Sequence, residues 1–211
     1  MDPGLTNLLK WGVENSSASA EQGVPHTPRP LDPAALDSLL GGPSDAELMR
    51  LSMAAIISED DDVSLEDKLV AFDNFEQLVE NLDNANNLGP LGLWTPLLGC
   101  LAHADSEMRT MAAWCVGTAV QNNETSQERL LAMNGIPPLA RMAVDKAEEG
   151  KVRRKAIYAL SSACRNYQPA MDVLTGELEK LGRSTWSVDA GDMEACDALI
   201  NGLKSDATDV D

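Results

Sequence analysis

The sequence has few of the residues on which enzyme and metal sites depend. It contains only two histidines and four cysteines in 211 residues. The cysteines lie far apart and form no CxxC pair, so the ligand spacing of a zinc site is missing. Because Cys100, Cys115 and Cys164 each lie in an apolar helical stretch, we expect them to be reduced, buried hydrophobic side chains. Cys196 is the fourth.

Basic charge is also scarce. The chain has 16 Lys and Arg residues against 34 Asp and Glu residues, a formal net charge of -18. Such a chain repels a phosphate backbone and an anionic membrane surface, so we expect no nucleic acid and no membrane partner. No run approaches the ~20 apolar residues that cross a bilayer, and residues 1–10 lack the layout of a secretory signal. We therefore expect a cytoplasmic protein, or one that also enters the nucleus.

Aromatic residues are few, which points to the fold class. Hydrophobic residues make up 44% of the chain, but only two Phe and two Tyr are among them. A core of Leu, Ala, Met and Val is typical of packed helices, so we predict an all-α fold. The sequence has no phosphate-binding loop, no metal-ligand set and no nucleophile with a positioned base. We therefore expect neither enzymatic activity nor a cofactor.

The N-terminal 42 residues differ from the rest. Apolar residues recur at helical spacing in a first short helix, and Asp32 and Gly41 bracket a second one. Between them, residues 14–30 are rich in Ser, Ala, Gly and Pro, a composition that does not order itself. We predict a flexible N-terminal segment over residues 1–42.

From residue 43 onward the chain repeats itself. Residues 107–130 laid over 151–174, an offset of 44, match at five positions and agree in apolar pattern. An earlier copy appears at an offset of 42, where Phe72 falls on Trp114, whose own counterpart is Tyr158. A helical period near 42 favours an armadillo or HEAT-like solenoid. We predict about three units over residues 43–174, then a helical cap and acidic tail over 175–211.

Three segments resemble one family. They are KLVAFDNFEQLVENLDNANNL at residues 68–88, GTAVQNN at 117–123 and LLKW at 8–11. Together they resemble the fungal armadillo-type nucleotide exchange factors of the seventy-kilodalton heat-shock chaperones, over residues 1 to about 174. The resemblance implies a monomeric co-chaperone whose concave face holds the chaperone's nucleotide-binding domain, opens it and accelerates ADP release. Longer members of that family continue through further units, so a shorter groove is expected here.

The resemblance also nominates contact residues, because the long third helix of each armadillo unit lines the groove. The first unit contributes Asn81, Asp83, Asn84, Ala85, Asn86 and Asn87. The second contributes Arg109, Thr118, Gln121, Asn122, Asn123 and Glu124. The third contributes Arg153, Arg154, Arg165 and Asn166.

Each nomination has a structural alternative. Asparagines at helix ends are often caps. The basic cluster over residues 151–155 is equally typical of internal ion pairs with neighbouring acids. Trp114 and Tyr158, which share one repeat position, are expected in the core or on the groove floor.

The resemblance gives the N-terminal segment a separate role, the release of polypeptide from the chaperone. Its apolar residues Leu5, Leu8, Leu9 and Trp11 would imitate a substrate peptide. The alternative is that they pack on the solenoid's own end. A general armadillo adaptor for extended peptides is the rival function, although such grooves usually carry repeated Trp and Asn ladders.

Overall fold

The computed structural model describes residues 41–208. The expected release segment and the short helices before residue 41 lie outside the described residues. Within residues 41–208 every regular element is helical, which confirms the all-α, armadillo-like fold. In that range no helix has the length and apolar character needed to cross a membrane.

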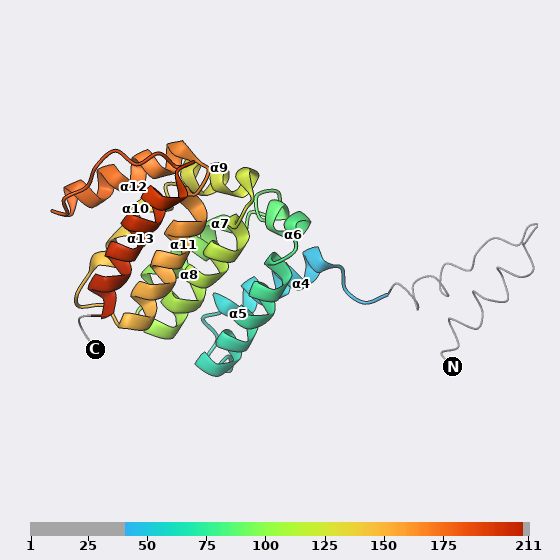
Figure 1. Cartoon of the computed structure of the whole chain (residues 1–211). Helices are drawn as coiled ribbons and strands as arrows, with labels where there is room; N and C mark the ends of the chain where they lie inside the picture. The colour runs from blue at the N-terminus through green and yellow to red at the C-terminus, as the bar shows by residue number, and fades with distance from the viewer. Residues whose placement is uncertain (1–40, 209–211) are drawn as a thin grey trace, which may run out of the picture. The chain divides into compact units, whose positions relative to one another are not determined.

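Two successive groups of three helices, each with a long third member, lie between an opening pair and a closing pair in the described residues. Their bounds are α4 Asp45–Ile56, α5 Leu65–Val79, α6 Leu82–Asn87, α7 Trp94–Gly99 with a 3-10 turn at Cys100–Ala102, α8 Ser106–Val120, α9 Glu124–Ala132, α10 Ile136–Val144, α11 Gly150–Cys164, α12 Gln168–Lys180 and α13 Met193–Thr208. Helices α5, α8, α11 and α13 lie side by side in chain order (Figure 1). We call this row of long helices the ladder.

Side-chain caps fix where several helices begin. Ser64 and Asp67 form a reciprocal capping box at the start of α5. Asp105 accepts from the backbone N–H groups of Glu107 and Met108 and so begins α8. The side chain of Asn123 accepts from the backbone N–H of Ser126 and so begins α9.

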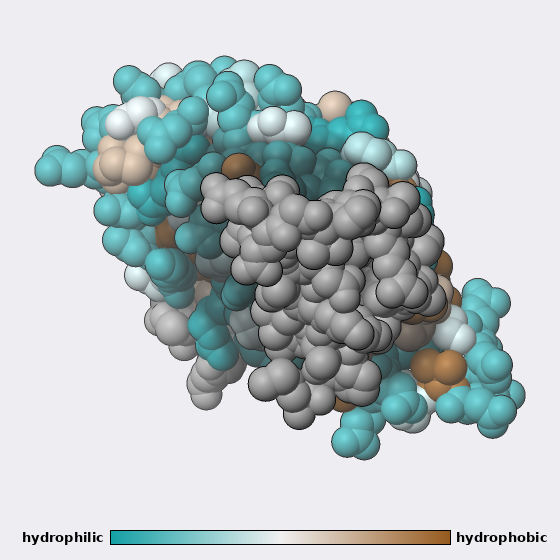
Figure 2. Space-filling model, turned by 90° about the vertical axis from the view of Figure 1, so that its right-hand side faces the viewer, coloured by the Kyte–Doolittle hydropathy of each residue, from teal (hydrophilic) through white to brown (hydrophobic). Residues whose placement is uncertain are grey.

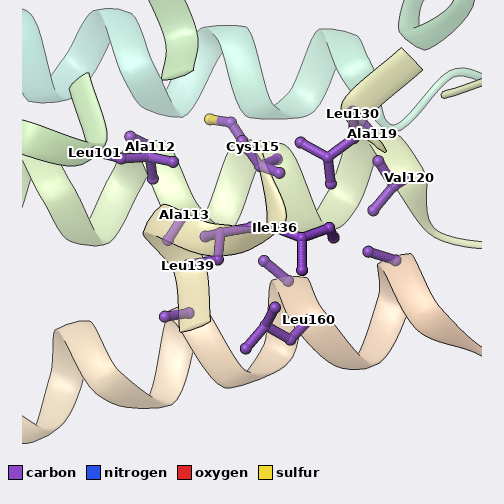
Figure 3. Close-up of a cluster of buried hydrophobic side chains, with 14 of the residues drawn as sticks. Leu101, Ala112, Ala113, Cys115, Ala119, Val120, Leu130, Ile136, Leu139 and Leu160 are labelled. Atoms are coloured by element: carbon purple, nitrogen blue, oxygen red, sulfur yellow. The ribbon is translucent and has the colours of Figure 1, made fainter. Parts of the chain in front are cut away.

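The core supports the repeat alignment. Ala112 and Ala156, which the 44-residue offset pairs, are both 0% exposed, and so are Val116 and Leu160. Figure 3 shows α8 between α5 and α11, with Cys115 pointing toward α5 and Leu160 rising from α11. Equivalent residues of successive units therefore fill equivalent layers of one continuous core.

The C-terminal helix α13 packs on the last unit, against α10 and α11. Arg153 of α11 is 0% exposed beneath it, and its guanidinium donates to the carbonyls of Ala143 and Asp206. Because a buried donor without a partner is costly, these two bonds tie α13 to the end of α10.

Figure 2 shows a mostly hydrophilic face on which apolar residues are scattered.

The four cysteines are free and buried, which confirms the expectation for Cys100, Cys115 and Cys164 and adds Cys196. Burial raises the pKa of the Cys115 and Cys164 thiols well above the ordinary value. Because the thiolate is the reactive form, these thiols are protected both sterically and chemically.

We predict that the folded chain resists alkylation by iodoacetamide at mildly alkaline pH, whereas the chain in guanidinium chloride is labelled at all four cysteines. Intact-mass spectrometry over time measures both rates, and we expect them to differ by a factor on the order of 100 or more, because labelling requires local opening. Rapid labelling of the folded chain would contradict the packing described above.

Candidate partner-binding groove

One side of the ladder is left partly exposed, and we call it the ladder face. On α8 it carries Met111, Trp114 and Thr118, which recur at helical spacing and are each partly buried. On α11 it carries Lys155 and Tyr158. The face therefore presents aromatic and polar groups from neighbouring helices along one line.

Side-chain hydrogen bonds join the helices across this face. Thr118 Oγ1 donates to Glu76 Oε1 at 2.6 Å, which connects α8 to α5. Tyr158 Oη donates to Gln121 Oε1 at 3.1 Å, which connects α11 to the end of α8. These bonds surround a hollow of about 380 Å³. It is lined by Glu76, Glu80, Trp114, Thr118, Gln121, Asn122 and Tyr158.

A cation already lies on the aromatic groups of the ladder face. The ammonium of Lys155 is 3.4 Å from the centroid of the Trp114 ring and 5.7 Å from that of Tyr158. Burial lowers the pKa of Lys155, while the nearby carboxylate of Glu76 acts in the opposite direction. The two rings therefore supply part of the stabilisation that water gives an exposed ammonium.

A second hollow, of about 450 Å³, lies between α6, α7 and α9. Ala85, Asn86, Trp94 and Arg129 are among the residues that line it. Asn86 is only partly exposed, and its Oδ1 is buried without a hydrogen-bond partner among the described residues.

The nominated asparagines of the first unit divide by role. Asn81 caps α6, since its side chain accepts from the N–H groups of Asp83 and Asn84. Asn84 is buried and donates to Asp45 Oδ2 at 2.8 Å and to the carbonyl of Leu78 at 3.0 Å. The remaining nominated residues border the second hollow or solvent: Ala85 and Asn86 line the hollow, and Asp83 and Asn87 are exposed.

Only some of the residues nominated in the second unit lie close together. Thr118, Gln121 and Asn122 meet at the first hollow. Asn123 is a buried cap, and Glu124 is exposed at the start of α9.

Arg109 lies at the opposite end of α8 from these residues. It forms a two-pronged ion pair with Glu148, at 2.6 and 2.7 Å, and donates to the carbonyls of His103 and Ala104. This ion pair raises the pKa of Arg109. Its donors are therefore engaged within the chain.

The residues nominated in the third unit lie in different environments. Arg153 is fully buried, and Arg154 is exposed. Arg165 pairs with Asp197 of α13 at 2.5 Å. Asn166 is exposed with φ of 57°, and its repeat counterpart Asn122 has φ of 50°, a left-handed conformation that asparagine tolerates. In the basic cluster, Lys151 forms ion pairs with Glu107 and Glu149, as the structural alternative expected.

Sequence reasoning did not nominate Glu76 and Glu80, which complete the first hollow. The repeat alignment contains the signal that would have found them. At the 42-residue offset Glu76 corresponds to Thr118 and Glu80 to Asn122, both of which were nominated. Residues at one repeat position tend to face the same surface, so the acidic pair belonged to the same set.

The fold and the ladder face define a short armadillo-type helical-repeat protein with a candidate partner-binding groove. The family model described as nucleotide exchange factor Fes1 matches residues 5–88. The Hsp70 nucleotide exchange factor FES1 of Gibberella zeae is 58% identical over 205 residues, covering 96% of each chain. The chain therefore belongs to the Fes1 family of nucleotide exchange factors, which confirms the resemblance seen in the sequence.

Other relatives differ in length. The Hsp70 nucleotide exchange factor fes-1 of Neurospora crassa is 47% identical, with 98% of this chain and 99% of that one covered. The protein of that name from Saccharomyces cerevisiae is 46% identical over 78% of this chain but only 57% of its own length. The family thus contains both short and longer chains. A crystal structure of an engineered protein has a TM-score of 0.53 at 16% identity, covering 83% of this chain and 71% of that chain, and supports the fold alone.

Proposed function

We propose that this chain is a nucleotide exchange factor for an Hsp70 chaperone. It binds the chaperone's nucleotide-binding domain and accelerates the release of ADP. The observation that carries the proposal is the 58% identity, over nearly the whole chain, to a relative named as an Hsp70 nucleotide exchange factor.

Linkage explains how binding alone accelerates release. A partner that binds the open, nucleotide-free domain better than the ADP-bound domain must itself bind more weakly when ADP is present. Couplings of this kind are typically ~1 to 3 kcal/mol, which corresponds to roughly 5- to 150-fold in affinity. The exchange factor needs no catalytic residue, only a surface that fits one state of its partner.

We propose that the contact surface is the ladder face together with the adjoining second hollow. Thr118, Gln121 and Asn122 support this because they gather at one hollow and are not sealed in the core. Arg109 and Arg153 have a different role in this proposal, since Arg109 is paired with Glu148 and Arg153 is fully buried, with two of its nitrogens bonded to backbone carbonyls. These two arginines hold the units together.

The direct test uses a cytosolic Hsp70 loaded with a fluorescent ADP analogue. Adding this chain together with excess unlabelled nucleotide should accelerate the loss of signal at least tenfold. A release rate that is unchanged at a several-fold molar excess would reject the exchange function. The general armadillo adaptor would then be the better assignment.

The N-terminal segment provides a second prediction, on the division of labour within the chain. Deleting residues 1–42 removes nothing from α4, which begins at Asp45. We therefore expect Hsp70 binding and ADP release to stay within about twofold of the full chain, because the described core is intact. Release of a fluorescent peptide from the chaperone's substrate site should slow by several-fold.

The matched variant replaces Leu5, Leu8, Leu9 and Trp11 with serine in the full-length chain. It should reproduce the slower peptide release if the apolar residues themselves are responsible. Loss of Hsp70 binding on deletion would contradict this division.

A further inference from the structure

The first hollow has two carboxylates on one wall. Glu76 is only 5% exposed, and Thr118 donates to one of its oxygens. Among residues 41–208 no hydrogen bond reaches its other oxygen, Oε2. Glu80 lies one helical turn further along and is exposed at the same hollow. Glu76 Oε2 is not one of the buried atoms that lack a partner, so it reaches the hollow and can accept from a donor that enters there.

Two aromatic rings also line the hollow. They belong to Trp114 and Tyr158, and the Lys155 ammonium at 3.4 Å from the Trp114 centroid shows that these rings accept a cation. Cation–aromatic contacts are worth roughly 0.5 to 2 kcal/mol, and more when water is excluded. The rings therefore favour positive charge in the same hollow as the carboxylates.

Lys155 does not fill this site. Its ammonium makes no hydrogen bond or ion pair with any residue in the described range, so its position depends on the rings and on Glu76 at longer range. One ammonium beside two carboxylates leaves the hollow with a formal charge of about -1 at neutral pH. The hollow therefore has both the space and the negative charge to accept a further cation.

We propose that this hollow receives a basic side chain, preferably arginine, from the nucleotide-binding domain of the Hsp70 partner. The cation pairs with Glu80 and with the unused oxygen of Glu76, and it stacks on the ring of Tyr158. Arginine fits best because its flat guanidinium both stacks on a ring and donates to two carboxylate oxygens. This inference rests on the proposed function and adds the chemistry of the contact.

The test compares charge changes at Glu80 with the same changes at Glu66, an exposed acid in the first turn of the same helix and outside the hollow. Binding of the full chain to the purified nucleotide-free domain is measured by calorimetry at low and moderate salt. We expect E80Q to weaken binding about fivefold, because it removes the charge, and E80K on the order of 50-fold, because it places a like charge against the incoming cation. E66Q and E66K should bind within about twofold of the wild type.

Because Glu76 is buried, a substitution there needs its own control for folding. In E76Q the new amide oxygen still accepts from Thr118, so its thermal unfolding midpoint should stay near that of the wild type while binding weakens. Wild-type binding by E80K, or an equal loss in E66K, would overturn the inference and leave the exchange function standing. A wild-type chain that neither binds the domain nor accelerates ADP release would overturn both.

Discussion

Replacing Gly117 with leucine is expected to separate α8 from α11 and to abolish the cooperative unfolding of the repeat stack. Gly117 is buried where these two long helices meet. A Cβ atom there would lie 2.5 Å from Cε1 of Tyr158 and 3.0 Å from the Cα of Ala159. Backbone cannot move out of the way without shifting the helix, so a larger side chain should cost more than ~3 kcal/mol.

Alanine at the same position gives a graded version of this experiment. Overpacking of ~1 to 3 kcal/mol opposes the gain of about 1 kcal/mol that alanine has over glycine inside a helix. We expect a net loss of up to about 2 kcal/mol in the free energy of unfolding, together with displacement of Tyr158 from its bond to Gln121. Urea unfolding followed by circular dichroism measures the change as a lower midpoint.

Gly176 in α12 is the matched control. A Cβ there would meet nothing within 4 Å. G176A should therefore stabilise the chain by roughly 0.5 to 1 kcal/mol, because only the helix propensity changes. If G117A proved as stable as G176A, the two helices would not approach as closely as the structure describes.

The same two helices show how far sequence reasoning reaches. The 44-residue offset predicted that α8 and α11 occupy equivalent places, and the paired alanines of their buried sides confirm it. Arg109 and Arg153 are identical residues at one repeat position, yet their environments differ. Arg109 meets the acid Glu148, whereas Arg153 is covered by α13.

The difference between these arginines was not visible in the sequence because α13 belongs to no repeat. Because α13 lies outside the repeat alignment, its sequence does not indicate which unit it packs against. Its docking depends on tertiary packing, and tertiary packing decides whether a charged side chain faces solvent or lies beneath a neighbour. The candidate site was limited in the same way. The resemblance pointed to the long third helices, but the Glu76 to Thr118 bond could be seen only with the two helices in place.

Removing the ring of Trp114 should strongly reduce the exchange activity. The indole lies beside the first hollow and beneath the Lys155 ammonium. Tryptophan is enriched among residues whose truncation costs 2 kcal/mol or more in a protein interface, and ~1.4 kcal/mol is a tenfold change. We therefore expect W114A to reduce the rate of ADP release at sub-saturating concentrations by at least tenfold.

Two further variants distinguish the loss of a partner contact from a loss of folding. Trp186 is 50% exposed and lines neither hollow, so W186A removes an indole at no cost to the ladder face and should exchange ADP at the wild-type rate. W114F keeps a flat ring under Lys155 and should retain most of the activity, because phenylalanine also accepts a cation, though less well. Equal rates for W114A and W186A would remove the ladder face from the proposed contact surface. A loss in W114A that W114F restores, without a matching change in unfolding midpoint, assigns the effect to the ring itself.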